Sequence, residues 1–152
     1  FLSLNAQINA ANRGFHTMEK YKNVDFVIIN ETELRHELRD KNDKINNLMK
    51  KLSNKINIVD LVVTQGSEGA TLFNKPTKKF YNMEAFASTV VDKIGSGDTM
   101  LSILSLMLKS NIDKSFSLLL GSLAASQSVS SIGNKRLIDR IKLIKASDHI
   151  LK

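Results

Sequence analysis

Residues 91–100 have the sequence VDKIGSGDTM, which is the most informative stretch of the chain. A β-branched run at 89–91 leads to two glycines, Gly95 and Gly97, and Asp98 follows them. The apolar run at 100–108 predicts a buried helix. A strand, a glycine turn and a helix N-terminus in this order are typical of an anion site. The first-turn N–H groups lack intrahelical acceptors, and the helix dipole adds partial positive charge.

Asp98 has two interpretations at such a site. Its carboxylate would repel a bound anion, but it could take a proton from a hydroxyl group that attacks a phosphate. Alternatively, an aspartate at the N-cap or in the first turn only complements the helix dipole. We predict that this helix runs from Asp98 to Ser110.

The rest of the chain alternates between strand and helix patterns. This alternation predicts an α/β fold with a mostly parallel sheet flanked by helices. Strands are predicted at 1–5, 24–29, 59–64, 70–73, 79–83 and 87–92. A helical turn is predicted at 17–21, and helices at 32–38, 44–52, 98–110, 114–130 and 136–151. An Asn-rich loop at 5–14 and a left-handed helix cap at 131–134 complete the prediction, and no boundary divides the single domain at 1–152.

Two further motifs follow predicted strands. The strand at 24–29 ends at an N-x-x-E pattern, Asn30 to Glu33, which also fits a helix capping box. The strand at 59–64 ends at a T-x-G-x-x-G pattern that begins with Thr64 and Gly66. A plain hairpin with glycines at positive φ explains this second pattern equally well.

Together, N-x-x-E, T-x-G-x-x-G and the D-x-x-G-x-G-D pattern at 92–98 resemble the ribokinase-like (PfkB) family of sugar kinases, in the family's order. The resemblance implies that Asp98 is the catalytic base. It also implies that the amides of Gly95, Ser96 and Gly97 form an anion hole for the transferred phosphoryl group.

The resemblance assigns the remaining site residues as well. Asn30 and Glu33 would organise Mg²⁺, largely through water, and Thr64 and Gly66 would meet the nucleotide phosphates. Ser122 and Ala125, in the predicted helix at 114–130, would lie near the adenine. Packing between helices through small residues is the alternative explanation for that helix.

The activity implied is ATP-dependent phosphoryl transfer to a hydroxyl group of a sugar or sugar phosphate. ATP and Mg²⁺ are the implied cofactors, and a monovalent cation is a further candidate. The resemblance covers the C-terminal half of a family kinase. Because the sequence opens at Phe1 on an apolar strand, we interpret it as a piece of a longer protein. We expect the N-terminal sugar-binding and lid portion to be missing and the piece alone to be inactive.

Two stretches suggest a subgroup of the family. The Asn-rich opening and the tail SIGNKRLIDR at 131–140 resemble the kinases fused to or paired with sugar nucleotidyltransferases, as in heptose activation. A nucleotidyltransferase domain, in the same or a partner chain, and a homodimer are therefore candidate assemblies.

Composition sets the outer limits. The chain has 152 residues, a hydrophobic fraction of 42%, no cysteine and a net charge of +7. No apolar run approaches the length of about 20 residues that a membrane helix needs, so we expect no membrane partner. The absence of cysteine suits a reducing compartment, and we expect a cytoplasmic protein. The basic residues are scattered, which argues against a nucleic-acid partner.

A non-catalytic nucleotide-binding or regulatory module, retained for assembly, is the alternative function. Lys93, which departs from the family pattern, favours this alternative. The presence of Asp98, Asn30 and Glu33 argues against it.

Overall fold

The computed structural model describes residues 1–5, 17–86, 95–130 and 137–151. These fall into two compact units. The first comprises Phe1–Gln65 and Thr71–Tyr81, and the second comprises Gly66–Ala70 and Asn82–Lys152. The strand predicted at 87–92, most of the Asn-rich loop and the cap predicted at 131–134 lie outside the described residues.

Five strands form one sheet in the order β1-β2-β3-β4-β5. They are β1 (Ser3–Asn5), β2 (Val24–Asn30), β3 (Ile58–Thr64), β4 (Ala70–Asn74) and β5 (Lys79–Met83). β1 pairs with β2 and β2 with β3, both in parallel. Most residues of β2 and β3 are buried, as expected for strands that are apolar on both faces. The predicted α/β fold with a mostly parallel sheet is confirmed.

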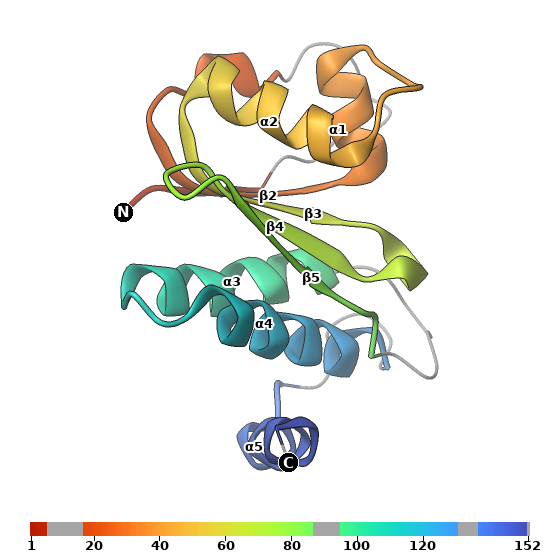
Figure 1. Cartoon of the computed structure of the whole chain (residues 1–152). Helices are drawn as coiled ribbons and strands as arrows, with labels where there is room; N and C mark the ends of the chain where they lie inside the picture. The colour runs from red at the N-terminus through yellow and green to blue at the C-terminus, as the bar shows by residue number, and fades with distance from the viewer. Residues whose placement is uncertain (6–16, 87–94, 131–136, 152) are drawn as a thin grey trace. The chain divides into compact units, whose positions relative to one another are not determined.

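The helices of the first unit lie over one face of β1–β3 (Figure 1). They are the short 3₁₀ helix η1 (Met18–Lys20), α1 (Glu31–Leu38) and α2 (Ile45–Ile56). α2 continues four residues beyond the predicted end at Leu52, because Ile56 extends its buried apolar side. The helix then ends at Asn57, whose φ of 59° is left-handed.

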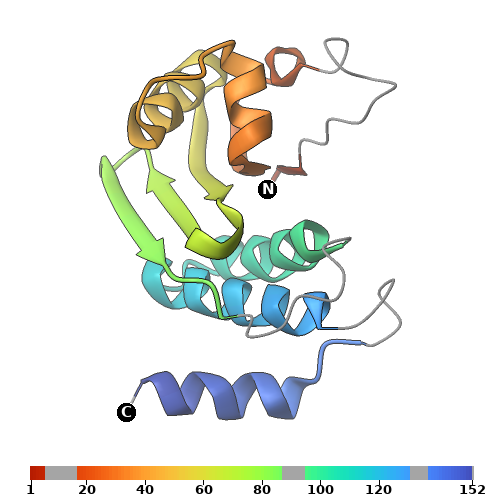
Figure 2. The same cartoon turned by 90° about the vertical axis from the view of Figure 1, so that its right-hand side faces the viewer.

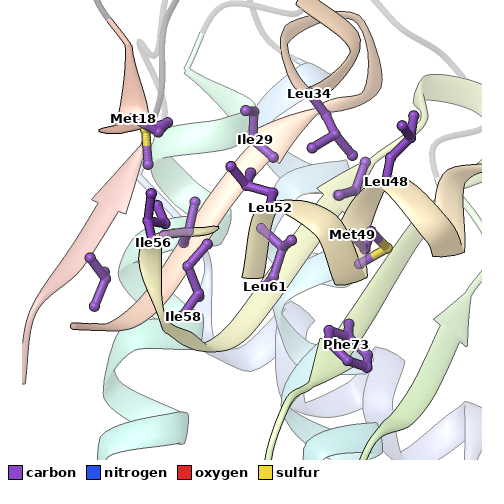
Figure 3. Packing of buried hydrophobic residues seen from close by; sticks show 13 residues of the cluster. Met18, Ile29, Leu34, Leu48, Met49, Leu52, Ile56, Ile58, Leu61 and Phe73 are labelled. Atoms are coloured by element: carbon purple, nitrogen blue, oxygen red, sulfur yellow. The ribbon is translucent and has the colours of Figure 1, made fainter. Parts of the chain in front are cut away.

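The core of the first unit lies between these helices and the strands (Figure 3). Full burial of one aliphatic side chain contributes about 1.5–3 kcal/mol. Burial of the apolar side chains of β2, β3 and α2 is therefore the main stabilising contribution in this unit. The buried members are Met18, Val24, Val27, Ile29, Leu34, Leu48, Met49, Leu52, Ile56, Ile58, Leu61, Val63 and Phe73.

The second unit is mainly helical, and it also includes Ala70 of β4 and the last two residues of β5. After the short 3₁₀ helix η2 (Gly66–Glu68) it contains α3 (Ser96–Lys109), α4 (Lys114–Val129) and α5 (Arg140–Ile150). α3 packs against α4, and α5 lies alongside α4 (Figure 2). No helix among the described residues combines the length and apolarity needed to cross a membrane.

The start of the last helix was predicted wrongly. α5 begins at Arg140 rather than at 136, because Asp139 acts as its N-cap. The Asp139 Oδ1 atom accepts hydrogen bonds from the N–H groups of Ile141 at 2.9 Å and Lys142 at 3.1 Å. A side-chain cap of this kind satisfies first-turn donors and sets where a helix starts.

Candidate functional site

The N-x-x-E and T-x-G motifs begin side by side in the first unit. Asn30 is the last residue of β2, Thr64 is the last residue of β3, and the two are partners in the parallel register. Ligands of open α/β sheets bind outside the carboxyl ends of the strands. Both motifs therefore begin at the edge of the sheet where a ligand is expected.

Asn30 and Glu33 form a capping box at the start of α1. The Asn30 Oδ1 atom accepts from the Glu33 N–H at 2.8 Å, and the Glu33 Oε2 atom accepts from the Asn30 N–H at 2.9 Å. The capping prediction is confirmed. The predicted role with Mg²⁺ stays a prediction, although an amide oxygen and a carboxylate are the oxygen donors that this ion prefers.

The two glycines of the T-x-G-x-x-G turn have different surroundings. Both have positive φ, 61° at Gly66 and 93° at Gly69, as the hairpin interpretation predicts. A Cβ atom on Gly69 would lie 2.0 Å from the Met83 carbonyl oxygen, so packing alone demands glycine there. A Cβ atom on Gly66 would meet no described residue within 4 Å. The open side of Gly66 leaves room for a ligand to approach the backbone.

The N-terminus of α3 holds the residues predicted for the anion hole. Gly95 is the N-cap, with a left-handed φ of 82°, and the first intrahelical bond runs from the Thr99 N–H to the Gly95 carbonyl at 3.0 Å. The helix starts at Ser96, two residues earlier than predicted, and this places Asp98 in its first turn. Asp98 is exposed. A first-turn carboxylate complements the dipole, and its role as a base stays a prediction.

The residues predicted near adenine lie on α4. Ser122 is buried, and Ala125 is half-buried. Among the described residues the Ser122 Oγ atom has no hydrogen-bond partner, and the Ser105 Oγ atom of α3 shares this property. A buried hydroxyl without a partner costs about 1–3 kcal/mol. The adenine role remains a prediction.

The alternative of helix packing through small residues is confirmed one position away from Ser122. A Cβ atom on Gly121 would lie 2.9 Å from the Leu104 Cγ atom of α3. Glycine at this position therefore allows α3 and α4 to approach closely.

Sequence reasoning missed a polar cluster of the first unit that joins the start of α1 to the residue after β3. Gln65 lies between Thr64 and Gly66, yet its side chain bonds to Glu31 of α1. The Glu31 carboxylate also binds Arg35 one helical turn further on, at 2.8 Å. The i,i+4 spacing of Glu31 and Arg35 was a readable signal for this ion pair. The contact of Gln65 depends on the strand register and had no such signal.

Two solved structures define the class of fold. Arabidopsis thaliana ribokinase, complexed with ribose and ATP, matches 80% of this chain and 40% of its own at a TM-score of 0.70 and 25% identity. Escherichia coli phosphofructokinase-2, in complex with potassium, matches 86% of this chain and 42% of its own. The TM-score of that match is 0.74, and at 19% identity the match supports the fold alone. The fold is that of the ribokinase-like kinases.

Residues 8–139 match the pfkB family carbohydrate kinases, and the chain belongs to this family. The bifunctional protein HldE of Campylobacter curvus (strain 525.92) is 38% identical over 84 residues, which are 55% of this chain and 17% of that protein. The chain thus spans a small part of this curated relative and about two fifths of the two kinases (40% and 42%). The predicted family is confirmed.

Proposed function

We propose that this chain carries the nucleotide-binding portion and the catalytic base of an ATP-dependent carbohydrate kinase. The acceptor is a hydroxyl group of a sugar or sugar phosphate. Membership of the pfkB family supports sugar kinase activity in general. The observation that carries the specific proposal is the N-terminus of α3, where a left-handed Gly95 precedes an exposed first-turn Asp98.

In this proposal the N-terminus of α3 performs the chemistry. The Asp98 carboxylate accepts the proton of the acceptor hydroxyl as the hydroxyl oxygen bonds to the γ-phosphorus atom of ATP. The bond from this phosphorus to the bridging oxygen breaks, and ADP leaves. The amides of Gly95, Ser96 and Gly97 donate to oxygens of the transferred phosphoryl group. Phosphoryl transfer depends mainly on such positioning and charge stabilisation, so few protein groups suffice.

The other predicted residues would hold the nucleotide and the metal. Thr64 and the open side of Gly66 would face the phosphates, while Ser122 and Ala125 would line the base. Mg-ATP supplies the phosphoryl group when bound. Asn30 and Glu33 would hold Mg²⁺ through water, since this ion keeps several waters and takes few carboxylates. A monovalent cation belongs to the proposal as a further cofactor.

The sugar-binding and lid portion would be supplied by residues outside these 152. The lengths of the matched relatives support this division, since the chain covers 40% of the ribokinase. A homodimer and a nucleotidyltransferase domain, in the same or a partner chain, complete the proposal. The Campylobacter relative is a bifunctional protein, and this supports a second activity beside the kinase.

Calorimetric titration with Mg-ATP tests the nucleotide site on the 152-residue chain. We expect binding to the wild-type chain and to Asp98→Asn, and loss of binding in Gly66→Val, whose branched side chain would occupy the open side of the turn. Asp148→Asn, which changes an exposed carboxylate of α5, is the matched control. Absence of binding in the wild-type chain, or full binding in Gly66→Val, would contradict the proposed site.

Turnover tests the catalytic base in a longer form that includes the proposed sugar-binding portion. Loss of a general base typically slows a reaction by about 10²–10⁴-fold. We therefore expect Asp98→Asn to lower kcat by that factor, with ADP release over a panel of sugars and sugar phosphates as the assay. Equal turnover in mutant and wild type would remove Asp98 from this role. Binding of Mg-ATP without any phosphorylated product would favour the regulatory module instead.

A further inference from the structure

Four side chains of the first unit form a continuous chain of hydrogen bonds that includes one residue from each of the two motifs. The Thr71 hydroxyl donates to Gln65 Oε1 at 3.2 Å, and Gln65 Nε2 donates to Glu31 Oε2 at 3.3 Å. Arg35 donates to Glu31 Oε1 through its Nε atom at 2.9 Å. Gln65 is the middle residue of T-x-G, and Glu31 is the second residue of N-x-x-E. Each motif thus contributes a residue that its consensus leaves unspecified.

The position of the link follows from the strand register. Asn30 and Thr64 are the last partners of the parallel β2–β3 pairing. Glu31 and Gln65 are the next residues on each strand, where α1 and the turn begin. The side-chain hydrogen bond therefore takes over where the backbone ladder stops. It ties the first residue after β3 to the first residue of α1.

The functional groups of the four side chains determine which one donates and which one accepts in each of these hydrogen bonds. An ionised carboxylate only accepts, so Gln65 must present its NH₂ group to Glu31. Its carbonyl oxygen then faces Thr71, whose hydroxyl must donate. Arg35 supplies the charge that balances Glu31. A single amide orientation satisfies both partners of Gln65, so both polar atoms of its side chain are engaged.

We propose that Gln65 is a positioning residue: through Glu31 it holds the T-x-G segment in the one geometry in which Thr64 and Gly66 can bind nucleotide phosphates. This inference rests on the proposed nucleotide site. Gln65 needs no contact with the nucleotide itself, since its side chain is already engaged by Glu31 and Thr71. Its effect is on the backbone conformation of its two neighbours.

A swap of the two polar groups tests the link. Gln65→Glu places a second carboxylate against Glu31, and the two like charges repel. The double variant Glu31→Gln with Gln65→Glu restores a donor opposite an acceptor, and the new amide oxygen can still accept from Arg35. Glu37→Gln is the matched control, because it makes the same change on α1 at a residue that instead binds the Met18 N–H.

Mg-ATP titration of the 152-residue chain gives the first readout. Loss of one hydrogen bond to a charged group corresponds to about a tenfold weaker interaction. We expect Gln65→Glu to raise the Kd of Mg-ATP by at least about fivefold, and the double variant to return within about twofold of wild type. Glu37→Gln should match wild type. Unchanged affinity in Gln65→Glu, or no recovery in the double variant, would overturn the proposal.

Amide hydrogen exchange at Gly69 provides a readout that needs no nucleotide. The Gly69 N–H bonds to the Gly66 carbonyl at 3.2 Å within the turn. We expect Gln65→Glu to speed its exchange at least about fivefold and the double variant to restore it. Unchanged exchange would overturn the positioning role. If the wild-type chain fails to bind Mg-ATP, the proposed function falls, and the exchange data still decide whether Gln65 holds the turn.

Discussion

Alanine substitutions at the two glycines of the T-x-G-x-x-G turn should both lower stability, but by different amounts and for different reasons. At Gly66 the cost is conformational, because φ is 61° and no described residue lies within 4 Å of an added Cβ atom. Left-handed backbone costs a non-glycine residue about 1–2 kcal/mol. The stiffer unfolded chain returns about 0.4–1 kcal/mol. We therefore expect Gly66→Ala to lower the free energy of unfolding by about 1 kcal/mol.

Gly69→Ala adds a steric term to the conformational one. Its Cβ atom would lie 2.0 Å from the Met83 carbonyl oxygen and 2.8 Å from two Glu84 backbone atoms, so the backbone must move. Overpacking of this kind costs about 1–3 kcal/mol. With the left-handed φ of 93° and the same return from the stiffer unfolded chain, the expected loss is about 1–4.5 kcal/mol.

Urea unfolding of both variants, followed by Mg-ATP titration of the folded fraction, checks this contrast. Gly69→Ala should shift the unfolding midpoint far more than Gly66→Ala. Gly66→Ala should still fold but bind Mg-ATP more weakly than the wild-type chain. Equal unfolding midpoints for the two variants would refute the packing argument. Wild-type affinity in Gly66→Ala would refute the idea that the open side of the turn receives the phosphates.

Two further predictions concern polar side chains away from the proposed site. Asn74 donates to the buried Asp60 carboxylate at 2.7 Å and accepts from the Thr77 N–H and hydroxyl. Asn74→Ala should therefore lower the free energy of unfolding by about 2–4 kcal/mol. A loss under about 0.5 kcal/mol in urea unfolding would contradict this. Hydrogen bonds from Lys51, at 2.8 Å, and other donors lower the pKa of Asp43 from 3.8 to about 2. Because the folded-state pKa is lowered, the ionised Asp43 carboxylate stabilises the fold fully above about pH 4, and this stabilisation is lost toward about pH 2. Lys51→Met should therefore flatten the dependence of Tm on pH in that window. An unchanged slope would show that the Asp43–Lys51 pair does not contribute to stability.

The elements that sequence reasoning located well are those whose signal is local. The apolar strand at 24–29 and the helix that follows it were predictable, because burial on both faces and a capping box each leave a short pattern. Helix ends were less accurate. α2 runs past its predicted end because Ile56 is buried, and α5 starts late because Asp139 caps it.

The site was predictable in outline only. The motifs Asn30–Glu33 and Thr64–Gly66 stand at strand ends in the sequence, so their proximity follows from any parallel pairing of β2 with β3. The different surroundings of Gly66 and Gly69 could not be predicted from the sequence. They depend on the backbone of Met83 and Glu84, which is distant in sequence but packs against Gly69. The bond from Gln65 to Glu31 was hidden for the same reason: register and side-chain orientation decide it.

The capping box and the proposed magnesium role of Asn30 and Glu33 are compatible. The box uses the Glu33 Oε2 atom on the Asn30 N–H, and the Asn30 Oδ1 atom on the Glu33 N–H. These two bonds hold both side chains in set orientations at the carboxyl end of β2, before any ligand arrives. Catalytic and binding groups work best when neighbouring bonds lock their rotamers in this way. In the proposed site the capping box therefore fixes the orientation of the Glu33 carboxylate.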